Sequence, residues 1–210
     1  GKNLCGAEFC APVAAMHGHV NYLKDKADYI FLPVYIEDPQ EARGFAQYCY
    51  YTQFVSSVIS VHRSLNEGQR LLMPLLRYSQ SEYFVGFELY KMFRSMGLND
   101  IGFLSISSAF EKAKKHFRSV NQKWKGLYDK ARKENDIHIA LLGRPYTVLS
   151  QAMNNSIPEI IEKMGITTVY MDMLPDEQGE GLDAEDLVRV VRWKFASAIL
   201  RYAGIAARTD

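Results

Sequence analysis

The hydrophobic positions of this chain follow two different periods, one typical of helices and one typical of buried strands. Val13, Met16 and Val20 recur at helical spacing within residues 11–24, after a proline that suits a first helical turn. The next apolar stretch, residues 28–36 (DYIFLPVYI), is a continuous β-branched and aromatic run that predicts a buried strand ending near its proline. The start of the chain therefore predicts a helix followed by a strand.

The same alternation continues to the end of the chain. Polar or acidic loops are expected at 37–44 and 172–181, and residues 101–106 form a short apolar run that fits either a helix or a strand. The pattern predicts strands at 71–76, 137–142 and 166–171, and helices at 48–65, 79–96, 107–135, 156–164 and from 183 onward. Alternating strands and helices favour parallel β-α units.

These elements predict an α/β fold of two Rossmann-like lobes, each a parallel sheet flanked by helices. We expect an N-terminal cysteine-bearing lobe at 1–106, a linking helix at 107–135 and a C-terminal lobe at 136–210. No strand precedes the first helix and none follows the last, so we expect the chain to be an excised, truncated piece of a longer polypeptide.

Composition narrows the class of protein. The 210 residues carry 25 Lys and Arg against 24 Asp and Glu, so there is no overall basic field of the kind that holds nucleic acid. No apolar run approaches the roughly 20 residues that cross a bilayer, and no signal peptide is recognisable. Three cysteines are too few for a disulfide framework. We expect a cytoplasmic protein without a nucleic-acid or membrane partner.

Two of the cysteines are candidate metal ligands. Cys10 precedes a predicted helix and Cys49 follows a predicted strand, so we expect both at the rim where parallel strands end and ligands bind. Thiolates are the soft ligands of iron–sulfur clusters and zinc. The 38 residues between them match no compact zinc pattern, and Cys5 does not complete one. The alternative is that both are buried thiols acting as small apolar side chains.

The turn Gly143-Arg144-Pro145-Tyr146 is the second candidate, because it follows a predicted strand. Glycine permits close backbone approach, and the arginine fork suits a phosphate or carboxylate such as those of coenzyme A. The alternative is a tight turn with Arg144 paired to an acidic neighbour. His17 and His19, two residues apart in a predicted helix, point to different faces and cannot both bind one metal.

Several motifs together resemble one known family. Glu8-Phe9-Cys10-Ala11-Pro12-Val13, His17-Gly18-His19-Val20, the strand at 28–33, Cys49 and Leu142-Gly143-Arg144-Pro145-Tyr146 are similar to the acyl-CoA dehydratase activase-related proteins. These are relatives of the cluster-carrying component of 2-hydroxyacyl-CoA dehydratases, including activator-related proteins, and are often fused to an ATP-dependent activase. The resemblance covers most of the chain. Tyr50 stands where the family usually has proline, and Ala14 and Ala15 where a lysine is usual.

The resemblance implies a [4Fe-4S] or double-cubane cluster in an oxygen-sensitive system of anaerobic bacteria. Cys10 and Cys49 match two ligand cysteines, and low-potential electron transfer would assist dehydration of a 2-hydroxyacyl-CoA. We expect the Cys10 and Cys49 thiolates to bind iron at a cleft between the lobes, with Arg144 and Tyr146 lining the opposite wall and Gly143 belonging to the same cofactor-binding turn. The implied partners are an ATP-dependent activase domain or electron donor and an acyl-CoA. The piece alone is expected to be inactive.

Two rival classes stay open: a metal-free acyl-CoA or small-molecule binding domain, and a structural or partner-binding domain.

Overall fold

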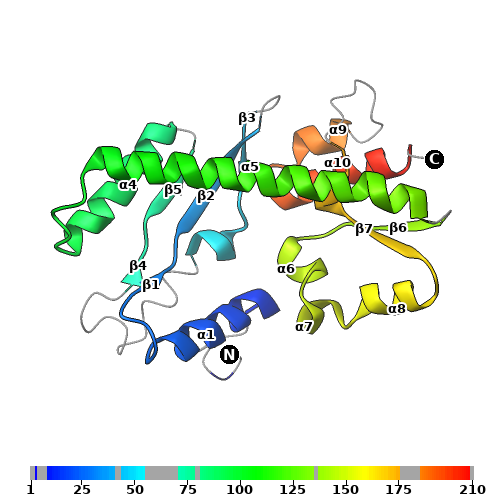
Figure 1. Ribbon diagram of the computed structural model, residues 1–210, viewed down its shortest axis with the longest axis horizontal. Helices are drawn as coiled ribbons and strands as arrows, with labels where there is room; N and C mark the ends of the chain where they lie inside the picture. The colour runs from blue at the N-terminus through cyan, green and yellow to red at the C-terminus, as the bar shows by residue number, and fades with distance from the viewer. Residues whose placement is uncertain are drawn as a thin grey trace. The chain divides into compact units, whose positions relative to one another are not determined.

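The computed structural model describes residues 3, 9–40, 44–54, 71–78, 81–134, 137–175 and 185–208. The chain divides into two compact units, Gly1–Phe110 and Glu111–Asp210. The long helix α5 (Phe103–Glu134) begins in the first unit and continues into the second (Figure 1). The boundaries expected from the sequence, at 106/107 and 135/136, stay a prediction.

The strands of unit 1 form two small sheets that follow one another along the same segments. In the first, β1 (Ile30–Phe31) pairs in parallel with β4 (Leu71–Leu72). In the second, β2 (Val34–Gln40) lies between the parallel strand β5 (Leu75–Arg77) and the antiparallel strand β3 (Gly44–Gln47) (Figure 1). Parallel pairing, which the sequence predicts for its β-α units in general, is therefore present in unit 1.

Prolines divide what the sequence predicts as single strands. The run 28–36 becomes β1 and β2, interrupted at Pro33, and the run 71–76 becomes β4 and β5, interrupted at Pro74. Because proline has no backbone N–H, neither residue can donate to a ladder. The hydrogen bonds on either side persist, from Leu32 N to Leu72 O (2.8 Å) and from Val34 N to Pro74 O (3.0 Å).

The polar segment 37–44 is not simply a loop, as the sequence suggests. β2 extends to Gln40, and β3 begins at Gly44 and pairs with it from Glu37↔Gln47 to Gln40↔Gly44. Backbone pairing sets this hairpin, and a polar composition does not prevent it at the edge of a sheet. The loop prediction was wrong for most of the segment.

The helices of unit 1 agree with the sequence where they are described. α1 (Ala11–Leu23) starts with proline in its first turn and buries Val13, His17 and Val20. Its Val20 joins Ile30 and Leu32 of the strand segment in one core cluster, with Met16 and Leu71 against it. Residues 50–54 are helical, and the rest of the helix predicted at 48–65 lies outside the described residues.

The helix α4 (Glu82–Ser95) packs against the first turns of α5. Ser81 caps its start by accepting a hydrogen bond from Phe84 N, and Gly97 follows its end with a φ of +79°, as expected for a stop. The Phe103 ring lies 5.1 Å from the Tyr83 ring and 5.9 Å from the Tyr90 ring. These contacts turn the ambiguous run 101–106 into the beginning of α5.

Unit 2 is built on one parallel strand pair. β6 (His138–Leu141) pairs with β7 (Thr167–Tyr170), and the connection carries the short helices α6 (Pro145–Val148), α7 (Gln151–Asn154) and α8 (Ile157–Lys163). A turn of 3-10 helix at Met171–Met173 follows β7. The sequence predicts α8 and both strands, but not α6 and α7.

The last helix of the sequence prediction is two helices. α9 (Glu185–Val190) ends before residues 191–193, and α10 (Lys194–Ala206) then begins with Trp193 as its N-cap. α10 provides Tyr202 and Ile205 to the core of unit 2, which α5 joins with Tyr128. The remaining core members are Val169, Met171 and Leu174, on and after β7.

The fold is therefore a mixture of helices and strands with small parallel sheets, consistent with an α/β class. In the part of the chain that the structure describes, no helix has the length and apolarity needed to cross a membrane.

Candidate functional site

Cys10 occupies the N-cap position of α1. Its carbonyl oxygen accepts hydrogen bonds from Val13 N (3.0 Å) and Ala14 N (3.1 Å), while its side chain makes no capping hydrogen bond. Pro12 in the first turn has a φ already suited to a helix, which explains why the helix starts here. The backbone of Cys10 is thus fixed by the helix, and its thiol is not used in the cap.

Cys49 has the same relation to the helical residues 50–54. Its carbonyl oxygen accepts hydrogen bonds from Thr52 N (2.8 Å) and Gln53 N (3.1 Å). The residue before it is held to β2, since Tyr48 N donates to Ile36 O (3.0 Å) and the Tyr48 ring lies 5.5 Å from that of Tyr35. Both candidate cysteines therefore stand where an anchored backbone passes into a helix.

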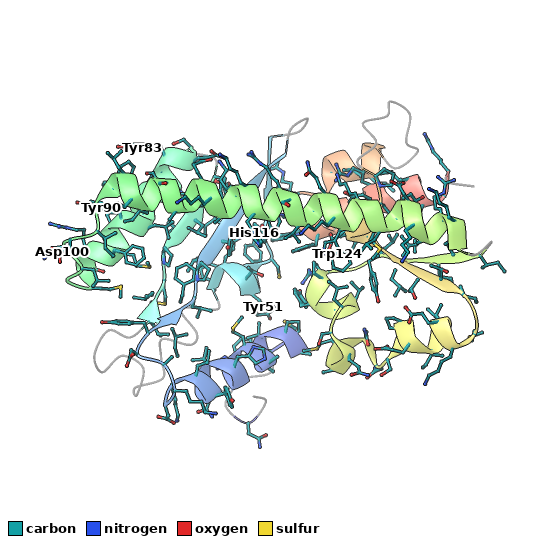
Figure 2. All side chains as sticks on the ribbon, in the orientation of Figure 1. Tyr51, Tyr83, Tyr90, Asp100, His116 and Trp124 are labelled. Carbon is teal, nitrogen blue, oxygen red and sulfur yellow. The ribbon has the colours of Figure 1, made fainter. Side chains whose placement is uncertain are left out.

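Aromatic rings bring the two cysteine-bearing segments together. Phe9, directly before Cys10, makes an edge-to-face contact with Tyr51 at 5.9 Å between ring centroids. The geometry is that of a favourable aromatic pair. Figure 2 shows Tyr51 beside α1. Segments far apart in the sequence are thus adjacent within unit 1.

Neither thiol has the environment of an inert core residue. Cys10 is exposed, Cys49 is half-buried, and both are free thiols. The alternative from the sequence, that they are small apolar side chains inside a core, does not describe either residue. Cys5 lies outside the described residues.

Cys49 does not lie at the rim expected from the sequence. The strand before Cys49, β3, is antiparallel to β2. The last residue of β3 therefore lies beside the amino-terminal part of β2, and not beside its carboxyl end. The sequence predicts the strand at 28–36 and a polar loop after it, and it does not predict β3. The expectation that Cys49 follows a parallel strand was therefore wrong, and the contact between Phe9 and Tyr51 replaces strand order as the reason for the two segments being adjacent.

The two histidines lie on different faces of α1, as the helical spacing predicts. His17 is buried, and its ring stacks on Phe9 at 6.2 Å, whereas His19 is exposed. Because His17 contacts the ring of Phe9, which in turn contacts Tyr51, it supports the segment that carries Cys10. Across the described residues, no group of three or more His, Cys, Asp and Glu side chains is placed to hold a metal ion.

The turn after β6 places Arg144 among aromatic rings. Its Nη1 donates a hydrogen bond to the Tyr146 hydroxyl (2.6 Å), and its guanidinium carbon lies 6.0 Å from the ring centroids of both Tyr146 and Phe195. A side chain on Gly143 would place its Cβ 2.6 Å from Val148 Cγ1, which explains the glycine. This turn follows a parallel strand, so it does lie at the carboxyl edge of the β6–β7 pair.

Two titratable side chains, Tyr170 and Asp172, lie at the end of β7 and in the turn directly after it. Partial desolvation raises the pKa of Asp172, after β7, above its usual 3.8, and the positive charge of Lys194 opposes that shift. Burial raises the pKa of the Tyr170 hydroxyl above 10.0, and the negative charges of Glu162 and Glu159 raise it further. Both groups thus retain their protons to a higher pH than in a solvated chain.

Three residues of these sites were missed by the sequence analysis as site components: Phe9, Tyr51 and Phe195. Phe9 stands next to Cys10 and Tyr51 stands two residues after Cys49, so an aromatic neighbour at both cysteines was the available signal. Phe195 lies in α10, far from Arg144 in sequence, and no local pattern indicates their contact.

Comparison with known proteins gives one family. The model of the family described as the CoA enzyme activase uncharacterised domain matches residues 1–174. The match contains both candidate cysteines and the Arg144 turn. Neither the curated proteins nor the solved structures gave a match.

Proposed function

Because the chain belongs to the CoA enzyme activase uncharacterised-domain family, we propose that its first unit is an iron–sulfur-binding part of a CoA enzyme activase system, in which Cys10 and Cys49 provide thiolate ligands. The observation that carries the proposal is the contact between Phe9 and Tyr51, which makes the two cysteine-bearing segments neighbours. The exposure of Cys10 and the partial exposure of Cys49 support it.

The residues fit the chemistry of such a group. Thiolate sulfur is the ligand that iron–sulfur clusters require, and neither thiol is engaged in a disulfide. A [4Fe-4S] or double-cubane cluster supplies low-potential electron transfer when it is bound. The chain contributes two sulfurs on backbones fixed by α1 and by the hydrogen bonds around Tyr48.

Two thiolates do not complete the ligand set of a cluster. Since the described residues contain no larger group of candidate ligands, the remaining ligands come from outside the described part of the chain or from another polypeptide. The proposed role is electron transfer towards a 2-hydroxyacyl-CoA dehydratase-type reaction, with an ATP-dependent activase domain or electron donor as partner. We also propose that the parallel strand pairs of the two units belong to Rossmann-like sheets.

The test is anaerobic iron–sulfur reconstitution of the full-length polypeptide, with iron content and visible absorbance as readouts. Cys10→Ser and Cys49→Ser should each lose most of the iron and colour, because each removes a soft ligand that serine does not replace. Cys5 lies outside the described residues and matches no position of the resembled family, so Cys5→Ser tests whether it is one of the remaining ligands. A Cys5→Ser protein that keeps its iron and colour excludes it. Equal iron in the wild type and in all three variants would refute the cluster proposal.

A second function is favoured by the geometry of unit 2, which is the binding of an acyl-CoA or another small anion by Gly143, Arg144 and Tyr146. The supporting observation is the guanidinium of Arg144, oriented by the Tyr146 hydroxyl and lying near two aromatic rings. An oriented guanidinium fork suits a phosphate group. This function does not require a metal.

Calorimetric titration of the full-length chain with coenzyme A tests this second function. Arg144→Lys keeps the positive charge but loses the planar fork, so it should weaken binding about tenfold. Arg201→Lys, on α10, is the matched control, because Arg201 also lies over an aromatic ring, that of Tyr202 (4.9 Å). Equal affinity of the wild type and both variants would exclude the turn as the binding site.

A further inference from the structure

The helix α5 concentrates positive charge in a chain that is otherwise acidic. It contains nine Lys and Arg and three Asp and Glu, which leaves 16 basic and 21 acidic residues for the rest of the sequence. The whole-chain charge of +1 conceals this separation. A local patch of one sign has consequences for binding that the net charge does not show.

Three of these side chains form a row along the middle of the helix. Lys112, Lys115 and Arg118 follow one another at three-residue spacing, and all three are exposed. We call them the basic row. Glu111, which is close to them in sequence, pairs instead with Lys114 at 3.0 Å. Within the described residues, no ion pair of the basic row is present.

The fold gives no structural reason for the basic row. Positive residues stabilise a helix near its carboxyl end, but that effect is confined to the last turn, where Arg132 and Lys133 already stand. Like charges three residues apart repel each other and destabilise a helix. The buried contacts of α5 are made by other residues, such as Ile106 and Tyr128. The row is therefore used neither in the core nor in a described ion pair, so its charges are available to a partner.

We propose that the basic row is a docking surface for an acidic patch on a partner protein, and that the partner is the CoA enzyme of the activase system. The identity of the partner rests on the proposed function. The expectation that the partner surface is acidic rests only on the charge of the basic row. Arg118 lies six positions after Lys112, a rise of about 9 Å, and Lys123 extends the exposed charge to about 16 Å. A small anion would engage only part of such a convex surface.

The charge of the rest of the chain argues for a local acidic patch instead of a long polyanion. A nucleic acid or an anionic membrane is held by many contacts over a broad basic field, and outside α5 the chain has 16 basic against 21 acidic residues, so it offers no such field. A protein partner can place its acidic groups opposite the basic row alone. Charge complementarity of this kind sets the rate and specificity of association.

The first experiment identifies the partner by photo-crosslinking in the native host. Benzoylphenylalanine replaces Lys115 in the full-length polypeptide, and it replaces the exposed Lys163 of α8 as the control. Position 115 should capture a CoA enzyme component that position 163 does not. Capture of a second copy of this chain, of nucleic acid or of lipid, or the same products from both positions, would overturn the proposal.

The second experiment measures binding of the purified, identified component. The triple variant K112E/K115E/R118E should bind about tenfold more weakly at low salt, and the difference should shrink as salt screens the charges. The control K24E/K163E/R192E changes the net charge equally but lies outside α5 and should bind like the wild type. Equal weakening of both variants would overturn the proposal.

Both triple variants should keep the helical far-ultraviolet circular dichroism spectrum of the wild type. This control shows that weaker binding is not caused by loss of folding. Iron uptake of the triple variant should equal that of the wild type, because no cysteine is changed. Failure of the cysteine variants to lose iron would refute the cluster proposal while leaving the docking result intact, so the two failures are distinguishable.

Discussion

At the scale of single residues, the proposed chemistry depends on Cys10 and Cys49, of which the first is exposed and the second half-buried. Thiolates bind iron, which is why the sequence predicts these residues as ligands; neither is buried as a small apolar core residue would be, and their ligation stays a prediction. The ring pair of Phe9 and Tyr51 could not be foreseen, because it joins residues far apart in the chain. Long-range contacts depend on tertiary packing, which local sequence patterns do not encode.

Gly143 gives a prediction at this scale. Gly143→Ala places a methyl group 2.6 Å from Val148 Cγ1, and valine has few rotamers with which to move away. We expect the free energy of unfolding to fall by about 1–3 kcal/mol. Urea unfolding followed by tryptophan fluorescence measures the change, because Trp124 and Trp193 both belong to unit 2.

Two further variants show whether the clash is the cause. The double variant with Val148→Ala should regain part of the loss, since the opposing methyl group is removed. Gly126→Ala in α5 meets nothing within 4 Å and should stabilise the protein by about 0.5–1 kcal/mol. A Gly143→Ala protein as stable as the wild type would contradict the steric explanation.

At the scale of elements, helices with a clear apolar period were predicted well, and strands near prolines were not. α1, α4, α5 and α8 were predicted to within a few residues, because each has a strong helical pattern or a glycine stop. The strand runs were divided at Pro33 and Pro74, and the helix predicted from 183 was divided at residues 191–193. Both divisions depend on which backbone N–H and C=O groups form hydrogen bonds. Hydrophobic periodicity does not indicate those hydrogen bonds.

The packing of α4 on α5 gives a prediction at the element scale. Gly86 is buried, and a Cβ there would lie 3.7 Å from Ser107 Oγ and 3.8 Å from Phe103 Cε2, which are ordinary contact distances. Gly86→Ala should therefore stabilise unit 1 by about 0.5–1 kcal/mol. Gly86→Leu should destabilise it by about 1–3 kcal/mol, because the helices have no room for a longer side chain.

Urea unfolding followed by far-ultraviolet circular dichroism measures both Gly86 variants. Figure 2 shows Tyr83 and Tyr90 of α4 near the start of α5, where the change would act. If Gly86→Leu were as stable as Gly86→Ala, the contact between α4 and α5 described here would be wrong.

At the scale of the whole molecule, the alternation of strands and helices was enough to indicate an α/β class, and the family match agrees with the resemblance seen in the motifs. What the alternation did not supply was the hairpin strand β3, next to the segment expected as a polar loop. β3 is antiparallel, and this reverses the edge of the sheet at which Cys49 stands. Strand direction is set by the length of each connection and the packing of its ends, which are properties of the assembled fold.

The accessibility of the two thiols has a consequence for how the polypeptide ages. A sulfur atom open to solvent is attacked by peroxide and climbs through sulfenic and sulfinic to sulfonic acid, and the later stages are irreversible. Because Cys10 is exposed and Cys49 is half-buried, Cys10 should be oxidised before Cys49. Each oxidation step adds the mass of one oxygen atom to the protein. Mass spectrometry of a stored sample therefore measures how far its thiols have been oxidised.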